Sequence, residues 1–166
     1  MRVRARTQVL SVLAWALVAW GLVACGQTHA DPLAAQAVLD AYKTFHREYL
    51  AVAETFPVNP DDPRVTAHLT GRELLQVHAQ LLTMRNTGQY VQGTIDVAPQ
   101  VTSVKGASAT VMDCNFDHIV FVDAATNQAR TQPASRRTLV TATMEEVGGV
   151  WKLADFGAGT SDCTTR

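Results

Sequence analysis

From Asp31 onward, the spacing of hydrophobic residues changes once along this chain, at about Gly88. Before it, apolar residues recur every three or four positions, which is the spacing of one buried helix face; after it, they alternate every second position, as in half-buried strands. Helical and strand segments do not alternate, so the sequence lacks the βαβ units of a parallel sheet. The pattern predicts an α+β fold in which N-terminal helices pack on one face of a curved antiparallel sheet.

A long amphipathic helix is expected first. Asp31 followed by Pro32 has the form of an N-cap and a first helical residue, and the helix should end near Pro57. Its expected buried face comprises Val38, Ala41, Tyr42, Phe45, Tyr49, Val52, Ala53 and Phe56.

A second helix is expected after a loop over residues 57–63, which contains three prolines, and a short helical turn over residues 64–68. Thr70-Gly71-Arg72-Glu73 fits a capping box, and the helix should end near Asn86. Its expected stripe comprises Leu74, Leu75, His78, Leu81 and Leu82.

Four to six antiparallel strands should follow. Glycines mark two tight hairpin turns, around Gly106 and around Gly148-Gly149. The expected strand segments are 90–97, 101–104, 107–116, 118–122, 137–146 and 150–156, with a polar loop over 123–133.

The first 24 residues have a different composition from the rest. Arg2, Arg4 and Arg6 precede an uncharged run over residues 9–24, which is short for a membrane span and typical of the hydrophobic region of an export signal. The run ends in Leu22-Val23-Ala24-Cys25, which resembles the bacterial lipobox. We therefore expect a lipoprotein signal peptide over 1–24, a diacylated Cys25, a spacer over 25–30 and one domain over 31–166. The alternatives are a signal cleaved after Ala30 and an uncleaved membrane anchor.

Removing this leader changes the charge. Of 14 basic residues three lie in the leader, which leaves 11 against 15 acidic residues and a net charge of −4. An acidic domain is not expected to bind nucleic acid through its phosphates. If Cys25 carries lipid, Cys114 and Cys163 remain, and we expect them to form a disulfide in an oxidising compartment, two buried free thiols being the alternative.

The layout of the chain resembles a known superfamily. A long first helix, a capped second helix, the hairpin VTSVKGASATVMDC and the closing strand GGVWKLADF resemble NTF2-like (SnoaL-like, cystatin-like) proteins, and more narrowly their secreted and lipoprotein members in actinobacteria. The resemblance spans about residues 31 to 163 and implies a cone-shaped α+β domain. It carries little information on function, because this fold supports catalysis, binding and scaffolding.

The resemblance implies that a pocket, if there is one, lies at the mouth of the cone. In enzymes of that superfamily a carboxylate and a His or Tyr exchange protons there with a small apolar ligand. We assign no catalytic residue, and name as candidates for the pocket Tyr42, Phe45, Tyr49, His78, Met112, Asp113 and His118. Asp96 lies on a neighbouring strand segment.

Other chemistries lack their motifs. The five histidines show no metal-ligand spacing, and no phosphate-binding glycine loop or nucleophile elbow occurs, so no metal or cofactor is expected. We expect a noncatalytic binding or accessory domain on the outer face of the cell membrane, with an apolar small molecule or an envelope protein as partner. The alternatives are a small-molecule isomerase, dehydratase or cyclase, and a structural subunit of an envelope or secretion assembly.

Overall fold

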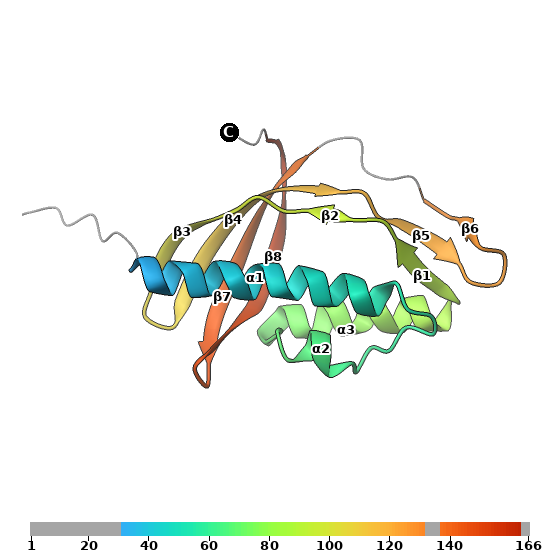
Figure 1. Ribbon diagram of the computed structural model, residues 1–166, viewed down its shortest axis with the longest axis horizontal. Helices are drawn as coiled ribbons and strands as arrows, with labels where there is room; N and C mark the ends of the chain where they lie inside the picture. Colours follow the sequence, from blue (N-terminus) through green and yellow to red (C-terminus); the bar gives the residue numbers. More distant parts are fainter. Residues whose placement is uncertain (1–30, 132–136, 164–166) are drawn as a thin grey trace, which may run out of the picture.

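The computed structural model describes residues 31–131 and 137–163, so the expected leader, Cys25 and the spacer lie outside the described residues. Three helices come first and strands follow, as the change of periodicity predicts (Figure 1). The helices are α1 (Pro32–Ala53), α2 (Pro63–Thr66) and α3 (Gly71–Asn86). The strands are β1 (Gln89–Gln92), β2 (Ile95–Asp96), β3 (Pro99–Lys105), β4 (Ser108–Asp117), β5 (Val120–Asp123), β6 (Gln128–Ala129), β7 (Thr138–Val147) and β8 (Val150–Asp162).

The strands form two antiparallel sheets that arch over the helices (Figure 1). In the larger sheet β4 pairs with β7 and β7 with β8, while the other edge of β4 pairs with β3 along its first half and with β2 at its end. The smaller sheet has the order β1-β5-β6. Helices α1 and α3 both contact β8, and the predicted α+β architecture with helices on one sheet face is confirmed.

The expected strand over 90–97 is divided by a bend at Gly93. Gly93 has a φ of +125°, and a Cβ on it would lie 2.5 Å from the carbonyl oxygen of His118. Only glycine accommodates that conformation and that close approach. The chain therefore leaves the smaller sheet after β1 and enters the larger sheet as β2.

Both predicted hairpins are confirmed. Lys105 pairs with Ser108 across the β3–β4 turn, and Val147 pairs with Val150 across the β7–β8 turn. Gly148 and Gly149 have φ values of 62° and 80°, which a two-residue hairpin turn of this kind requires. Strand β8 runs to Asp162, further than its predicted end at Phe156, because pairing with β7 continues through its small residues.

Helix α1 begins as predicted, with the Asp31 side chain accepting a hydrogen bond from the backbone N–H of Leu33 (3.1 Å). Helix α3 also begins where expected, but its capping-box prediction is wrong. Thr70 makes no side-chain cap, and the Glu73 side chain is turned into the core. The backbone holds this end instead: Thr70 N–H donates to the Leu153 carbonyl (2.9 Å) and Leu153 N–H to the His68 carbonyl (2.9 Å).

The predicted stripe of α3 is confirmed for Leu81, which is fully buried, and for Leu74, which packs against the core, but it is wrong for Leu75, His78 and Leu82. The buried positions are Glu73, Val77, Leu81 and Met84, whereas Leu75 is 71% exposed and Leu82 38%. A parallel bridge between Leu69 and Leu153 holds the chain just before α3 against β8, which α3 also contacts. Hydrophobicity alone favoured the leucines, because a buried Glu is rare.

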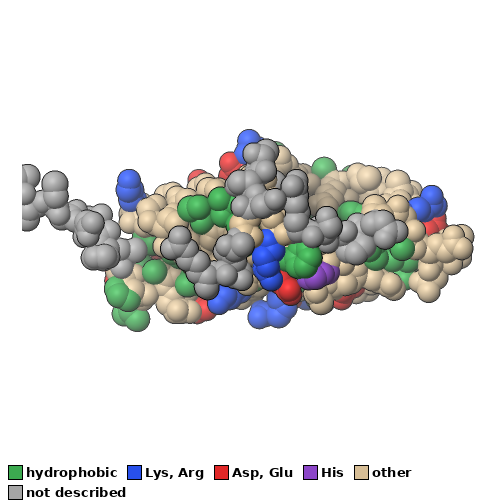
Figure 2. Space-filling model, turned by 90° about the horizontal axis from the view of Figure 1, so that it is seen from above, with side chains coloured by type: hydrophobic (Ala, Val, Ile, Leu, Met, Phe, Trp, Pro, Cys, Tyr) green, Lys and Arg blue, Asp and Glu red, His purple; other side chains and the backbone are tan. Residues whose placement is uncertain are grey.

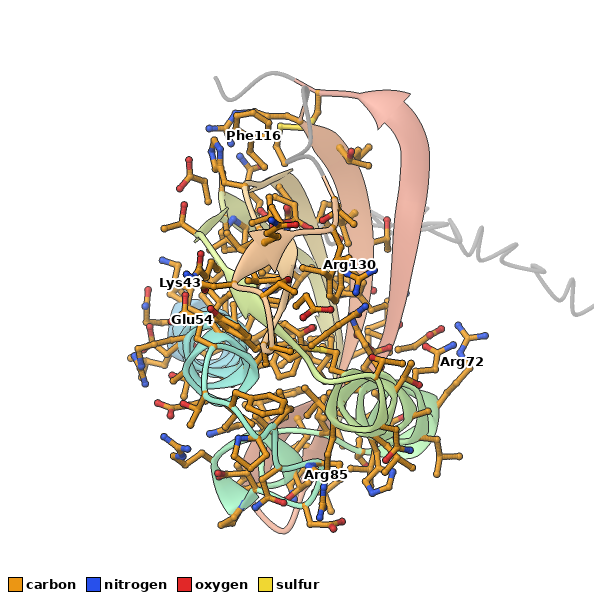
Figure 3. All side chains as sticks on the ribbon, turned by 90° about the vertical axis from the view of Figure 1, so that its right-hand side faces the viewer. Lys43, Glu54, Arg72, Arg85, Phe116 and Arg130 are labelled. Atoms are coloured by element: carbon orange, nitrogen blue, oxygen red, sulfur yellow. A yellow bond between two sulfur atoms is a disulfide. The ribbon has the colours of Figure 1, made fainter. Side chains whose placement is uncertain are left out.

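The disulfide predicted between Cys114 and Cys163 is present, with the two Cα atoms 5.8 Å apart (Figure 3). It links β4 to the residue after β8, across the intervening β7. The core between helices and sheet is built on large, fully buried side chains such as Tyr42, Leu81, Met84, Met144 and Leu153. Within residues 31–131 and 137–163, no helix is long and apolar enough to cross a bilayer.

Candidate functional site

A cavity of about 200 Å³ opens between α1, α3 and the end of β4. Its apolar wall comprises Phe45, Tyr49, Val77, Ile95, Ile119 and Phe156. Its polar groups are His46, Glu73, Gln80, Asn115 and Asp117. Figure 3 shows α1 and α3 side by side beneath the strands. An apolar hollow with a few converging polar groups is the usual form of a small-molecule site.

Helix α1 supplies three of the lining residues through its periodicity. Phe45, His46 and Tyr49 lie within four positions of one another and therefore on one face. His46 is four residues after the buried Tyr42 and three before Tyr49, which places an imidazole in the middle of an otherwise hydrophobic stripe.

Helix α3 supplies Glu73, Val77 and Gln80, which are spaced four and three residues apart. The contact between Leu69 and Leu153 brings the first turn of α3 against β8. Glu73 also lies near the backbone of Phe156, which lowers the pKa of its carboxyl and so opposes the effect of burial.

Strand β4 contributes through alternation. Ala109, Val111 and Asp113 are buried, so the odd-numbered residues of β4 face the helices. Asn115 and Asp117 continue this parity to the end of the strand, where they line the cavity. The inner face of one strand thus changes from apolar to acidic along its length.

His46 is a buried, neutral imidazole. It is 7% exposed, and its Nε2 atom has no hydrogen-bond partner among the described residues. Three aromatic rings surround it, with ring centroids at 4.6 Å for Tyr42, 5.2 Å for Phe45 and 6.1 Å for Phe156. Burial lowers the pKa of His46 to about 4, because an imidazolium would lose its hydration here.

Glu73 is the second buried polar residue of the cavity. It is 7% exposed, and its Oε2 atom has no partner within the part of the chain that the structure describes. Burial raises the pKa of the Glu73 carboxyl, and the nearby charge of Asp155 raises it further, while Arg72 opposes both. A buried carboxylate with an unsatisfied oxygen is costly, so a partner for that oxygen would stabilise the site.

Asp117 is the second carboxylate of the cavity, and Tyr49 contributes a phenol to the otherwise apolar wall. Burial raises the pKa of Asp117, although its Oδ1 accepts a hydrogen bond from Ile119 N–H (2.8 Å). Burial also raises the pKa of Tyr49, and the charges of Asp117 and Glu73 add to this effect. Both carboxylates therefore disfavour ionisation of the same phenol, that of Tyr49.

The groups in this cavity can accept hydrogen bonds from a ligand and can exchange protons with it. His46 Nε2 and Glu73 Oε2 both lack partners within residues 31–131 and 137–163, and displaced pKa values mark groups able to act as acid or base. The same stretches contain no group of three or more His, Cys, Asp or Glu placed to hold a metal ion.

Of the residues that the sequence suggested for a pocket, the structure places Phe45 and Tyr49 in the cavity. Tyr42 and Asp113 face the core beside it but do not line it. The Tyr42 hydroxyl donates to Asp113 Oδ2 (3.0 Å), and Ala98 N–H donates to Asp113 Oδ1 (2.6 Å), so this pair is already satisfied.

Met112 and His118 lie outside the cavity. Met112 is 38% exposed, because even-numbered positions of β4 face outward. His118 stacks near Phe116, with ring centroids 4.0 Å apart, and its Nε2 lies 3.3 Å from Asp96 Oδ2. Arg137 lies over the Phe116 ring at 5.5 Å. Figure 2 shows basic, hydrophobic, acidic and histidine side chains meeting on this outer side of the sheet.

His78 also lies outside the cavity. Its side chain is 40% exposed, and its Nε2 lies 3.1 Å from Asp61 Oδ1 in the loop before α2. The buried face of α3 carries Glu73 and Val77 rather than His78.

Sequence reasoning missed His46, Glu73, Asn115 and Asp117, although a signal existed for three of them. His46 lies on the helical stripe between Tyr42 and Tyr49, and Asn115 and Asp117 share the parity of Val111 and Asp113. Nothing in the sequence separates Glu73 from an ordinary capping-box residue.

Comparison with known proteins gives fold-level similarity only. No protein-family model matches the chain, and no curated protein matches its sequence. Among solved structures, the intermembrane space region of the chloroplast protein ARC6 has a TM-score of 0.60 at 14% identity, covering 80% of this chain and 99% of that one.

Two bacterial structures are also similar. A candidate aromatic ring hydroxylase from Novosphingobium aromaticivorans has a TM-score of 0.55 at 10% identity and covers 78% of this chain and 91% of its own. A candidate dehydratase of the NTF2-like family from Streptomyces avermitilis has a TM-score of 0.50 at 12% identity, covering 76% of this chain and 95% of that one. At these identities the likeness concerns the fold and not the activity. The chain has the NTF2-like α+β fold, with an arched antiparallel sheet over N-terminal helices.

Proposed function

We propose that this protein is an exported, lipid-anchored domain that binds a small molecule in the cavity between α1, α3 and β4. The observation that carries the proposal is that two residues lining one cavity, His46 and Glu73, each hold a buried polar atom, Nε2 and Oε2, without a partner among the described residues. Buried polar atoms are nearly always paired, and those left unpaired call for a specific explanation.

A bound ligand supplies that explanation. Each unpaired buried group costs about 1–3 kcal/mol, which a ligand with matching polar atoms would recover. The remaining wall is aromatic and aliphatic, including Phe45, Val77 and Phe156, so the rest of the ligand is apolar. The cavity volume of about 200 Å³ favours a small molecule over a peptide segment.

A thermal-shift screen of small amphipathic molecules tests this proposal. A ligand that binds only the folded state raises the melting temperature, and the rise grows with the logarithm of the ligand concentration once this exceeds Kd. Val77→Phe fills the cavity, so its melting temperature should no longer respond, whereas the matched control Val147→Phe, at a position 45% exposed on β7, should respond like the wild type. Each change in melting temperature is measured from the variant's own baseline, so a destabilised variant remains informative.

If Val77→Phe fails to fold, Ile119→Phe at the cavity wall takes its place. Ligands that stabilise the wild type and the cavity variants equally, or a screen in which no molecule stabilises the wild type, would contradict the binding function.

The anchoring part of the proposal rests on the sequence of residues 1–25. A basic start, a short uncharged run and Cys25 after three apolar residues support lipid attachment at the outer face of the cell membrane. Two or more acyl chains hold a protein stably on a bilayer. Cys25→Ala should move the protein from the membrane fraction to the soluble fraction. Unchanged fractionation, together with a wild-type mass that includes no lipid, would contradict it.

Proton-transfer catalysis, such as that of an isomerase, a dehydratase or a cyclase, is the second candidate. The observation that favours it is the gathering of His46, Glu73 and Asp117, whose pKa values are all displaced, in one cavity. Incubation of a confirmed ligand with the protein, followed by NMR of the ligand, separates the two candidates. Conversion that Glu73→Gln abolishes supports an enzyme, and an unchanged ligand supports binding alone.

A further inference from the structure

The charges around the cavity have one sign. Glu73 and Asp117 line it, and no Lys or Arg does so among the described residues. Arg72 acts on the pKa of Glu73, but its guanidinium pairs with Asp155, so the two charges offset each other. In Figure 3, Arg72 and Lys43 both point to the outer sides of the two helices, away from the space between them.

The histidine on the cavity wall does not change this sign at neutral pH. His46 is 7% exposed, and burial lowers its pKa to about 4, so its imidazole is neutral. His118 lies outside the cavity and faces Asp96, while its effect on Asp117 is small beside that of burial. Two acids in a partly desolvated hollow therefore have no lining cation, within the described part of the chain, to neutralise them.

We propose that the cavity binds a small organic cation, an amine with an apolar or aromatic body. This inference rests on the proposed binding function and names its ligand class. The ammonium group donates hydrogen bonds to the carboxylates of Glu73 and Asp117, which line the cavity and are acceptors when ionised. Charge-assisted hydrogen bonds of this kind are roughly twice as strong as neutral ones.

The aromatic wall favours the same ligand. The rings of Phe45 and Tyr49 lie with their centroids 6.0 Å apart, and Phe156 lies against His46 from the sheet side. Aromatic faces attract organic cations through their quadrupole and also cover an apolar body. A carboxylate ligand would instead meet two like charges, and a neutral ligand would leave them uncompensated.

Three compounds of similar size and shape test the charge preference: benzylamine, benzyl alcohol and benzoate. Each is titrated into the purified full-length protein while backbone NMR signals of the cavity residues are followed. Benzylamine should bind about tenfold more tightly than benzyl alcohol, because its ammonium group adds an attraction between opposite charges that the neutral hydroxyl lacks. Benzoate should not perturb the cavity signals.

Glu73→Gln is the decisive variant. It removes one charge with little change of shape and should weaken benzylamine about tenfold while leaving benzyl alcohol within about twofold. The matched control Glu146→Gln removes an exposed carboxylate from β7 and should leave both affinities unchanged. Asp117→Asn provides a second test if Glu73→Gln does not fold. Benzylamine affinity should also fall in acid, because Glu73 and Asp117 become protonated and His46 gains a positive charge near pH 4.

The outcomes separate this inference from the binding function on which it rests. Equal affinities for the amine and the alcohol, unchanged in Glu73→Gln, overturn the cation preference and leave the binding function in place. Preferential binding of benzoate does the same. If none of the three compounds perturbs the cavity signals, the cation inference fails, and the thermal-shift screen with Val77→Phe decides the binding function independently.

Discussion

The Tyr42 hydroxyl donates a hydrogen bond of 3.0 Å to Asp113 Oδ2, joining the middle of α1 to the middle of β4 across 71 sequence positions. Tyr42 is fully buried and Asp113 is 1% exposed. Burial raises the pKa of Asp113, while the hydrogen bonds from Ala98 N–H and Tyr42 oppose that effect. The pair fixes the helix against the strand next to the cavity.

Tyr42→Phe should destabilise the domain by about 1–3 kcal/mol, because it leaves Asp113 Oδ2 buried without its donor. Urea unfolding followed by circular dichroism measures the change. Tyr90→Phe is the matched control: its hydroxyl bonds Asn127 Oδ1 near the surface, and the change should lie within about 0.5 kcal/mol. Equal stability of the two variants would show that Asp113 needs no tyrosine partner.

Stability should decrease in acid partly because of His46. Its native pKa is about 4 against 6.5 in the unfolded chain, so between these values the unfolded state binds the proton first. The stabilisation is complete above pH 6.5 and is lost as the pH falls toward 4. The loss amounts to about 3 kcal/mol, because each tenfold difference in proton affinity between the two states corresponds to about 1.36 kcal/mol.

His46→Phe removes this contribution. Between pH 7 and pH 4 the wild type should lose about 3 kcal/mol more stability than the variant, as measured by urea unfolding at each pH. Parallel stability curves for the two proteins would mean that His46 is not held neutral by burial.

Gly93→Ala should destabilise more than a substitution at another glycine with positive φ. The new Cβ would lie 2.5 Å from the His118 carbonyl oxygen, so the β1–β2 bend would have to move. Gly106→Ala is the control: its φ is 58°, but no heavy atom of the described residues beyond its chain neighbours lies within 4 Å of the added carbon. Only the backbone cost of about 1–2 kcal/mol is therefore expected. Thermal unfolding of both variants should rank them in this order, and the reverse ranking would argue against the close approach.

The disulfide should contribute strongly to stability. Cys114 and Cys163 are 49 positions apart, and the chain-entropy model gives about 4 kcal/mol for closing a loop of this length. A Cys114→Ala/Cys163→Ala variant should therefore melt lower, while a reductant should lower the melting temperature of the wild type but not of the variant. A wild type insensitive to reductant would indicate that the bond adds little to the folded state.

The order of helices and strands can be predicted from the sequence, because it depends on signals between neighbouring residues. Asp31-Pro32, the hairpin glycines and the change of hydrophobic period each depend on neighbouring residues, and the structure follows them closely. The buried face of α3 and the division of the strand at Gly93 involve contacts with β8 and His118, which are distant in the sequence. Local patterns contain no information about those contacts.

The site was harder to predict, because its polar residues occupy positions that the pattern reserves for hydrophobic ones. The sequence pattern places Phe45 and Tyr49 on a buried aromatic stripe, whereas it predicts that Glu73 is part of a helix cap. A conflict between polarity and burial, as at His46 and Glu73, is more typical of functional positions than of structural ones.

The disulfide at Cys114 also restricts which strand registers the chain can adopt while it folds. Cys114 lies on the outward parity of β4, so its link to Cys163 identifies which side of that strand is outermost. A shift of β4 by one residue would turn Met112 and Phe116 inward and would expel Asp113 and Asp117. If the disulfide forms before the core closes, it would disfavour mispaired strands. In the reduced chain, only the burial of apolar side chains would disfavour them. The disulfide is therefore expected to favour the register of β4 in which Asp113 and Asp117 face the helices.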